Sequence, residues 1–154
     1  MTCYAVFART LSGIPIFLFT DFEFMICLRF NEMQIVVLGE LMNITAAEFF
    51  EKVVATRDNP SVVIIDIRTL DEYEIYHLSG AVNIDFYKDD FADMLDALDR
   101  NKTYMIYCRT GRRTGTDENN ARDLMKRMGF TDVYNMLGGI HEFVKVPGAD
   151  DFID

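Results

Sequence analysis

The sequence predicts an α/β fold with a mostly parallel central sheet and helices on both of its faces. Short β-branched or apolar runs alternate with amphipathic stretches from residue 43 onward. Such alternation needs crossover connections, which make the strands parallel and bring helices to both faces of the sheet. Two capping boxes precede amphipathic stretches, which supports the helices independently. The chain has 154 residues, half of them hydrophobic, which is enough for the core of one domain.

Four apolar segments are typical of strands: 62–65, 81–84, 104–107 and 133–137. The first is the continuous run Val62-Val63-Ile64-Ile65, which predicts a strand buried on both faces. The third leads directly into Cys108. Ligands of open α/β sheets bind beyond the carboxyl ends of the strands, so Cys108 stands where a functional residue is expected.

Helices are predicted between these strands. Thr45 with Glu48, and Thr69 with Glu72, form the two capping boxes that open the first and second helix. Apolar residues at helical spacing mark two further helices, and we expect their methionines and aromatic residues in the core. These two stripes are Phe91, Met94, Leu95 and Leu98, and then Ala121, Leu124, Met125 and Met128.

The pattern divides the chain into a hydrophobic N-terminal extension, residues 1–42, and a domain over residues 43–154. The extension is rich in phenylalanine and isoleucine, but Pro15, Asp21, Glu23 and Arg29 interrupt it. A membrane-spanning helix needs roughly 20 consecutive apolar residues, so membrane association is not expected. The sequence leaves the role of this extension open.

Charge and cysteine content exclude several classes of function. The formal net charge of −10 argues against nucleic-acid binding, which needs a basic surface. Three cysteines at irregular spacing, with no CxxC pair, argue against a disulfide framework and against a metal site. Cys3 and Cys27 are expected to be ordinary small apolar residues. A reducing, cytoplasmic location is the simplest expectation.

One loop concentrates the positive charge. Arg109, Arg112 and Arg113 lie within five residues of Cys108. Nearby cations and a following helix N-terminus both favour the thiolate, which is the reactive form of cysteine. Gly111 permits the tight backbone that turns successive N–H groups inward and forms an anion-binding nest. The loop is therefore predicted to hold the thiolate of Cys108 and an anionic substrate, through Arg109, Thr110, Gly111, Arg112, Arg113 and Thr114.

The loop length argues against one class of enzyme with a catalytic cysteine. Cysteine-dependent phosphatases have an arginine six positions after the cysteine, but here that position is Thr114 and Arg113 comes one residue early. The shorter loop disfavours a small-anion phosphatase or an arsenate reductase. The alternative to a reactive site is that Cys108 is an ordinary buried residue and that the loop arginines only balance nearby carboxylates.

Residues 43–143 resemble a single-domain rhodanese. The loop from Cys108 to Arg113 is similar to the six-residue active-site loop of that family, with cysteine first and arginine sixth. Asp66-Ile67-Arg68 with Glu72-Tyr73 resembles its first signature. His77-Leu78-Ser79-Gly80-Ala81-Val82-Asn83-Ile84 and Leu137-Gly138-Gly139 resemble two later stretches.

The resemblance implies a sulfurtransferase. Cys108 would take sulfur from a small anionic donor such as thiosulfate and pass it, from a persulfide, to cyanide, a thiol or a protein acceptor. No cofactor is implied. Asp66 and Arg68 would brace the loop from behind, and His77 would serve packing. Arg113→Ala would mainly weaken capture of the donor.

The sequence departs from the rhodanese pattern in one segment, and one alternative function stays open. The segment 115–120 lengthens the chain between the loop and the next helix, so we expect that helix to start late. The main competing hypothesis is a non-catalytic or redox-sensing interaction module that keeps the fold.

Overall fold

The computed structural model describes residues 41–154, so the expectations for Cys3, Cys27 and residues 1–40 lie outside its described part. Five strands form one sheet in the order β1-β5-β4-β2-β3, and all their pairings are parallel. This confirms the predicted α/β class. The strands are β1 (Leu41–Ile44), β2 (Val62–Asp66), β3 (Val82–Asn83), β4 (Thr103–Tyr107) and β5 (Val133–Met136).

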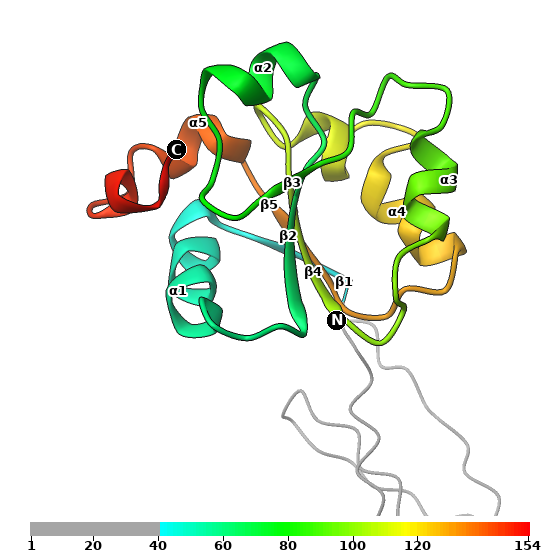
Figure 1. Ribbon diagram of the computed structural model, residues 1–154, viewed down its shortest axis with the longest axis horizontal. Coiled ribbons are helices and arrows are strands. Elements are labelled where there is room, and N and C mark those ends of the chain that lie inside the picture. Colours follow the sequence, from blue (N-terminus) through cyan, green and yellow to red (C-terminus); the bar gives the residue numbers. More distant parts are fainter. Residues whose placement is uncertain (1–40) are drawn as a thin grey trace, which may run out of the picture. The chain divides into compact units, whose positions relative to one another are not determined.

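Helices cover both faces of the sheet, as predicted. Helices α1 and α5 lie on one face, α3 and α4 on the other, and α2 lies beyond the carboxyl ends of the strands (Figure 1). The helices are α1 (Ala46–Thr56), α2 (Leu70–Ile75), α3 (Phe91–Asp96), α4 (Ala121–Arg127) and α5 (Gly139–Phe143). A π-helical turn, η1 (Arg112–Thr116), and a 3-10 turn, η2 (Ala149–Phe152), complete the described elements.

Both predicted capping boxes are present. Thr45 begins α1 and Thr69 begins α2, and each hydroxyl accepts a hydrogen bond from the backbone of the glutamate three residues later. The glutamates Glu48 and Glu72 accept a hydrogen bond from the backbone N–H of the cap residue, so two backbone donors at the start of each helix are satisfied. The short helix α2 therefore has a defined start, directly after β2.

The core consists of two clusters, one on each face of the sheet. On the α1 and α5 side, Phe49, Tyr107 and Phe143 are fully buried and their rings pack edge to face. On the α3 and α4 side, Leu95, Ile106 and Met125 are fully buried. Burial of this apolar surface on both faces fixes the sheet and the ends of its strands.

Two sequence-based expectations about burial were wrong. In β2 only Ile65 and Asp66 are buried, because β3 pairs with just those two residues and leaves the first half of β2 at an open edge. Met94 of α3 is 40% exposed, so it does not belong to the core that its helical spacing predicted. No helix in the described region is long and apolar enough to span a membrane.

Candidate active site

Cys108 follows β4 directly and lies at the carboxyl end of the sheet. The strand is central in the sheet order, between β5 and β2, so the residue after it is surrounded by the core. Cys108 is fully buried and its thiol is free. The position predicted from the sequence is the one a ligand-binding residue occupies in an open parallel sheet.

The first two carbonyls of the loop are held by helix α5. The Cys108 carbonyl accepts from the Ile140 N–H at 2.9 Å, and the Arg109 carbonyl accepts from the His141 N–H at 3.1 Å. Gly139 allows this approach, because a Cβ there would lie 2.3 Å from the Cys108 carbonyl oxygen. The loop backbone is therefore fixed through its carbonyls.

The loop amides, unlike these two carbonyls, have no partner among the described residues. Gly111 has φ +80°, a left-handed conformation that glycine adopts without strain. No acceptor within residues 41–154 is bonded to the N–H groups of the six residues that follow Cys108. Successive backbone N–H groups without partners, beside a buried thiol, are the chemical requirement of an anion nest.

The extra residues after the loop form the π-helical turn η1 and a connecting segment. As expected, the next helix starts late: α4 begins at Ala121, with Asn120 as its cap. Gly115 packs so closely against Asn135 that a Cβ there would lie 2.1 Å from the Asn135 amide nitrogen. The insertion is thus packed down onto β5.

Thr114 is the one loop side chain with a hydrogen-bond contact to the thiol. It is fully buried, and its Oγ1 lies 3.7 Å from Cys108 Sγ. Sulfur is a large acceptor, and a hydroxyl at this distance is placed to donate to a thiolate. The turn η1 positions Thr114, because the residue lies in the middle of it.

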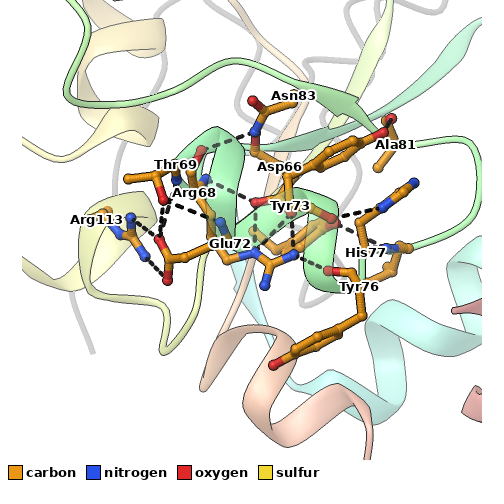
Figure 2. A network of polar contacts seen from close by, with 12 residues as sticks. Asp66, Arg68, Thr69, Glu72, Tyr73, Tyr76, His77, Ala81, Asn83 and Arg113 are labelled. Atoms are coloured by element: carbon orange, nitrogen blue, oxygen red, sulfur yellow. Dashed lines mark hydrogen bonds and ion pairs between the residues drawn. The ribbon is translucent and has the colours of Figure 1, made fainter. Parts of the chain in front are cut away.

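Arg113 is held away from bulk solvent by Glu72 of α2. Its guanidinium donates two hydrogen bonds to the two carboxylate oxygens, at 2.9 and 3.1 Å (Figure 2). The Tyr87 ring lies 5.5 Å from the guanidinium, and the Arg113 side chain is only 14% exposed. Burial opposes the charge of Arg113, but its hydrogen bonds to Glu72 and its electrostatic interactions with Glu72 and Cys108 together outweigh burial and raise its pKa.

The other loop residues are more open. Arg109, Thr110 and Arg112 are exposed, whereas Gly111 is buried. The Arg112 Nε contacts Asp117 at 3.1 Å in an exposed ion pair, with 72% of the arginine side chain accessible. The predicted loop residues thus lie in unlike environments, and Thr114 is the one whose side chain contacts the Cys108 thiol.

Asp66 and Arg68 form a buried ion pair behind the loop. Their side chains are 0% and 2% exposed, and Arg68 also donates to the Tyr76 carbonyl at 2.6 Å (Figure 2). The pair borders Tyr107, the residue before Cys108. The Tyr107 hydroxyl accepts a hydrogen bond from the Leu78 N–H. Burial, and then the nearby Asp66 carboxylate, raise the pKa of Tyr107, so this hydroxyl stays neutral.

His77 has a packing position. Its ring stacks on Tyr73 with centroids 3.8 Å apart, and Nδ1 lies 3.0 Å from the Tyr73 carbonyl oxygen.

The sequence indicated Glu72 only as part of a capping box and of a family signature, and it did not indicate the contact of Glu72 with Arg113. The residues 41–154 contain no cluster of three or more side chains suited to a metal ion.

Comparison with known proteins identifies the family. The family model of the rhodanese-like domain matches residues 50–146. The chain therefore belongs to the rhodanese-like domain family. Among solved structures, the rhodanese-like domain of the Alr3790 protein from Anabaena sp. has a TM-score of 0.52 at 18% identity, covering 73% of this chain and 77% of that one. The SSP1007 protein of Staphylococcus saprophyticus has a TM-score of 0.51 at 26% identity, covering 71% and 96%.

The curated relatives that match in sequence include a sulfurtransferase and a hydroxylase. Thiosulfate sulfurtransferase PspE of Escherichia coli is 33% identical over 86 residues, which cover 54% of this chain and 78% of that protein. The tRNA uridine(34) hydroxylase of Pectobacterium atrosepticum is 32% identical over 99 residues, which cover 62% of this chain and 27% of that protein. This chain thus spans about a quarter of the length of the hydroxylases it matches.

Proposed function

We propose that this chain is a sulfurtransferase that carries sulfane sulfur as a persulfide on Cys108. The observation that carries the proposal is the loop itself: a buried thiol at the end of β4, followed by six residues whose backbone N–H groups have no acceptor within residues 41–154. The likeness to PspE, named a thiosulfate sulfurtransferase, supports thiosulfate as the donor.

The first step moves one sulfur atom to the protein. The Cys108 thiolate attacks the outer sulfur of thiosulfate and forms an S–S bond. The bond between the two thiosulfate sulfurs breaks, and sulfite leaves with its electron pair. The terminal sulfur of the new persulfide is anionic, so the loop N–H groups and the Thr114 hydroxyl favour it electrostatically.

The second step regenerates the thiolate. A nucleophile, either cyanide or the thiolate of a small molecule or protein, attacks the terminal persulfide sulfur. The S–S bond breaks toward Cys108, which takes the electron pair, and the product is thiocyanate or the acceptor's persulfide. Covalent catalysis divides the transfer into two displacements that share one nest.

A reducing compartment keeps cysteine thiols from forming disulfides, so a cytoplasmic location fits the proposal. The tRNA hydroxylase likeness does not favour an RNA substrate, because it covers only 27% of that protein and this chain carries a net charge of −10. Small anionic donors and thiol acceptors remain the proposed partners.

Steady-state transfer of sulfur from thiosulfate to cyanide tests the proposal. We expect wild type to form thiocyanate and Cys108→Ser to be inactive with an unchanged circular dichroism spectrum. Cys27→Ser is the matched control, and it should stay active. Thiocyanate formation by Cys108→Ser at the wild-type rate would exclude Cys108 as the sulfur carrier. An inactive, well-folded wild type would favour the interaction module.

A further inference from the structure

Two large apolar side chains are exposed on the segments that flank Arg113. Ile75, the last residue of α2, is 77% exposed, and Tyr87, which follows β3 in the chain, is 67% exposed. They are the most exposed large apolar side chains of residues 41–154. Single exposed apolar residues are common on protein surfaces, so the position of these two decides whether they mark a binding surface.

Both side chains lie beside the ion pair of Glu72 and Arg113. Ile75 follows Glu72 by three residues, which makes the two side chains neighbours on the surface of α2. On the other side, the Tyr87 ring lies 5.5 Å from the Arg113 guanidinium. Arg113 in turn interacts electrostatically with Cys108. The two apolar side chains therefore border the pair that is coupled to the thiol.

The ring of Tyr87 is held in place from below. It packs edge to face on Phe86, with ring centroids 5.5 Å apart, and Phe86 packs in the same way on the buried ring of Phe91. A ring that is fixed before binding loses little conformational entropy when a partner covers it. Tyrosine is also among the residues that most often anchor protein interfaces.

Acidic side chains surround the two apolar ones. All are exposed, and none has an ion-pair partner among the described residues: Asp71, Glu74, Asp89 and Asp90. We call Ile75, Tyr87 and these four carboxylates the docking rim. Its negative charge repels nucleic acid and anionic lipid, and it attracts a protein surface that is basic.

We infer that the docking rim binds a protein sulfur acceptor whose reactive cysteine is surrounded by basic and apolar residues. The inference rests on the proposed function, because it takes the partner as the acceptor of the Cys108 sulfur. Cys108 is fully buried, so an acceptor must be held against the loop while its own sulfur enters. Basic residues around the partner's cysteine also keep it as the nucleophilic thiolate.

Transfer to the docked partner is a single displacement. The partner's thiolate attacks the terminal sulfur of the Cys108 persulfide and forms a new S–S bond. The bond between the two persulfide sulfurs breaks, and Cys108 keeps the electron pair as its thiolate. The partner leaves with the transferred sulfur as its own persulfide.

Activated peptides measure docking without any sulfur donor. Each peptide carries one cysteine as a mixed disulfide with thiopyridine, and the Cys108 thiolate attacks the peptide sulfur and expels thiopyridine. One peptide places lysines and leucines around the cysteine, a second replaces the lysines by glutamates, and a third replaces the leucines by serines. The product is located by mass on the Cys108 peptide of the full-length protein, so that Cys3 and Cys27 do not contribute. Each rate is divided by the rate with dipyridyl disulfide, a small neutral reagent, so that changes in thiol reactivity cancel.

We expect the basic, apolar peptide to react about tenfold faster than its acidic analogue at low salt, with a smaller difference at high salt. The serine-containing peptide should be about threefold slower than the leucine-containing one. Equal normalised rates for all three peptides would overturn the inference. So would a thiol that reacts with none of the peptides, because no docked acceptor could then reach it.

Variants of the rim locate the binding surface. Ile75→Ser and Tyr87→Ser should each lower the normalised rate of the basic, apolar peptide about threefold. Val54→Ser is the matched control, since Val54 is also exposed on a helix, at 48%, but lies on α1. A loss with Val54→Ser equal to that with Ile75→Ser would contradict the assignment.

The charges of the rim are tested in the same way. Asp71→Asn with Glu74→Gln should reduce the preference for the basic peptide about threefold. Glu51→Gln with Asp58→Asn removes two exposed carboxylates at α1 and should reduce it less. Equal reductions by the two double variants would show a general effect of net charge and would overturn the rim as a docking surface.

A second copy of the chain is the competing occupant. If sedimentation shows a dimer that Ile75→Ser dissociates, and the normalised peptide rates do not change, the rim is an interface between copies and the inference is wrong. Failure of the proposed function looks different: thiosulfate then leaves no sulfur on Cys108, although the peptides still show the expected preferences. Conversely, a Cys108 persulfide that cyanide removes, together with equal peptide rates, would keep sulfur carriage and exclude docking at the rim.

Discussion

The hydroxyl of Thr114 is the side-chain group best placed to act on the sulfur of Cys108. Both residues are fully buried, and the two atoms are 3.7 Å apart. A hydrogen bond to a charged group contributes about 1.5–3 kcal/mol, which corresponds to about tenfold or more in rate. We therefore predict that Thr114→Val slows single-turnover persulfide formation at least about tenfold. Thr114→Ser keeps the hydroxyl and should retain most of the rate; equal losses in both variants would assign Thr114 to packing.

Gly139 determines how closely α5 approaches the loop. It has φ +61°, and a Cβ would lie 2.3 Å from the Cys108 carbonyl oxygen. Gly129 provides a control, because it also has a positive φ, +89°, but a Cβ there would meet no atom within 4 Å. In urea unfolding, Gly129→Ala should cost about 1–2 kcal/mol of stability. Gly139→Ala should cost at least about 2 kcal/mol more, because overpacking adds to the backbone strain. Similar losses at both positions would contradict the tight contact.

Helix α2 is tied to the active-site loop through Glu72, and this link depends on pH. Burial would raise the pKa of Glu72, but hydrogen bonds from Arg113 and Thr69 outweigh it and lower the pKa below its ordinary value of 4.5. Because the folded-state pKa is depressed, the link contributes stability above about pH 4.5 and loses it as the pH falls through the lower folded-state value.

We predict that wild type exceeds Glu72→Gln in unfolding free energy by about 1 kcal/mol at pH 7, and that the difference shrinks below about pH 4.5. Urea unfolding from pH 3 to 7 measures this difference. A gap that stays constant down to pH 3 would mean that the carboxylate charge of Glu72 does not hold the loop.

Elements with strong local signals were predictable from the sequence. The capping boxes fixed the starts of α1 and α2, and the apolar run before Cys108 placed the thiol at a strand end. Helix α5 was missed because it begins at Gly138-Gly139, where glycine weakens any helical signal. Strand β1 was missed as well, because Asn43 interrupts its apolar pattern and finds its partner, Asn135, only in the folded sheet.

At the scale of the whole molecule, the site is assembled from parts that are distant in sequence. Arg113 and Glu72 are 41 positions apart, and helix α5 reaches the loop from beyond the last strand. Loop composition predicted a basic pocket around Cys108, but could not show which arginine is compensated. That distinction comes from the sheet order, which places the ends of β4 and β2 side by side.

The proposed function requires that Cys108 carries the transferred sulfur. The most direct test is the mass of the Cys108 peptide after incubation of the full-length protein with thiosulfate, under conditions that preserve persulfides. We expect this peptide to gain one sulfur atom, and we expect cyanide to remove that atom completely and form thiocyanate. A peptide that gains no sulfur in a folded protein, or a sulfur that appears on Cys3 or Cys27 instead, would contradict it.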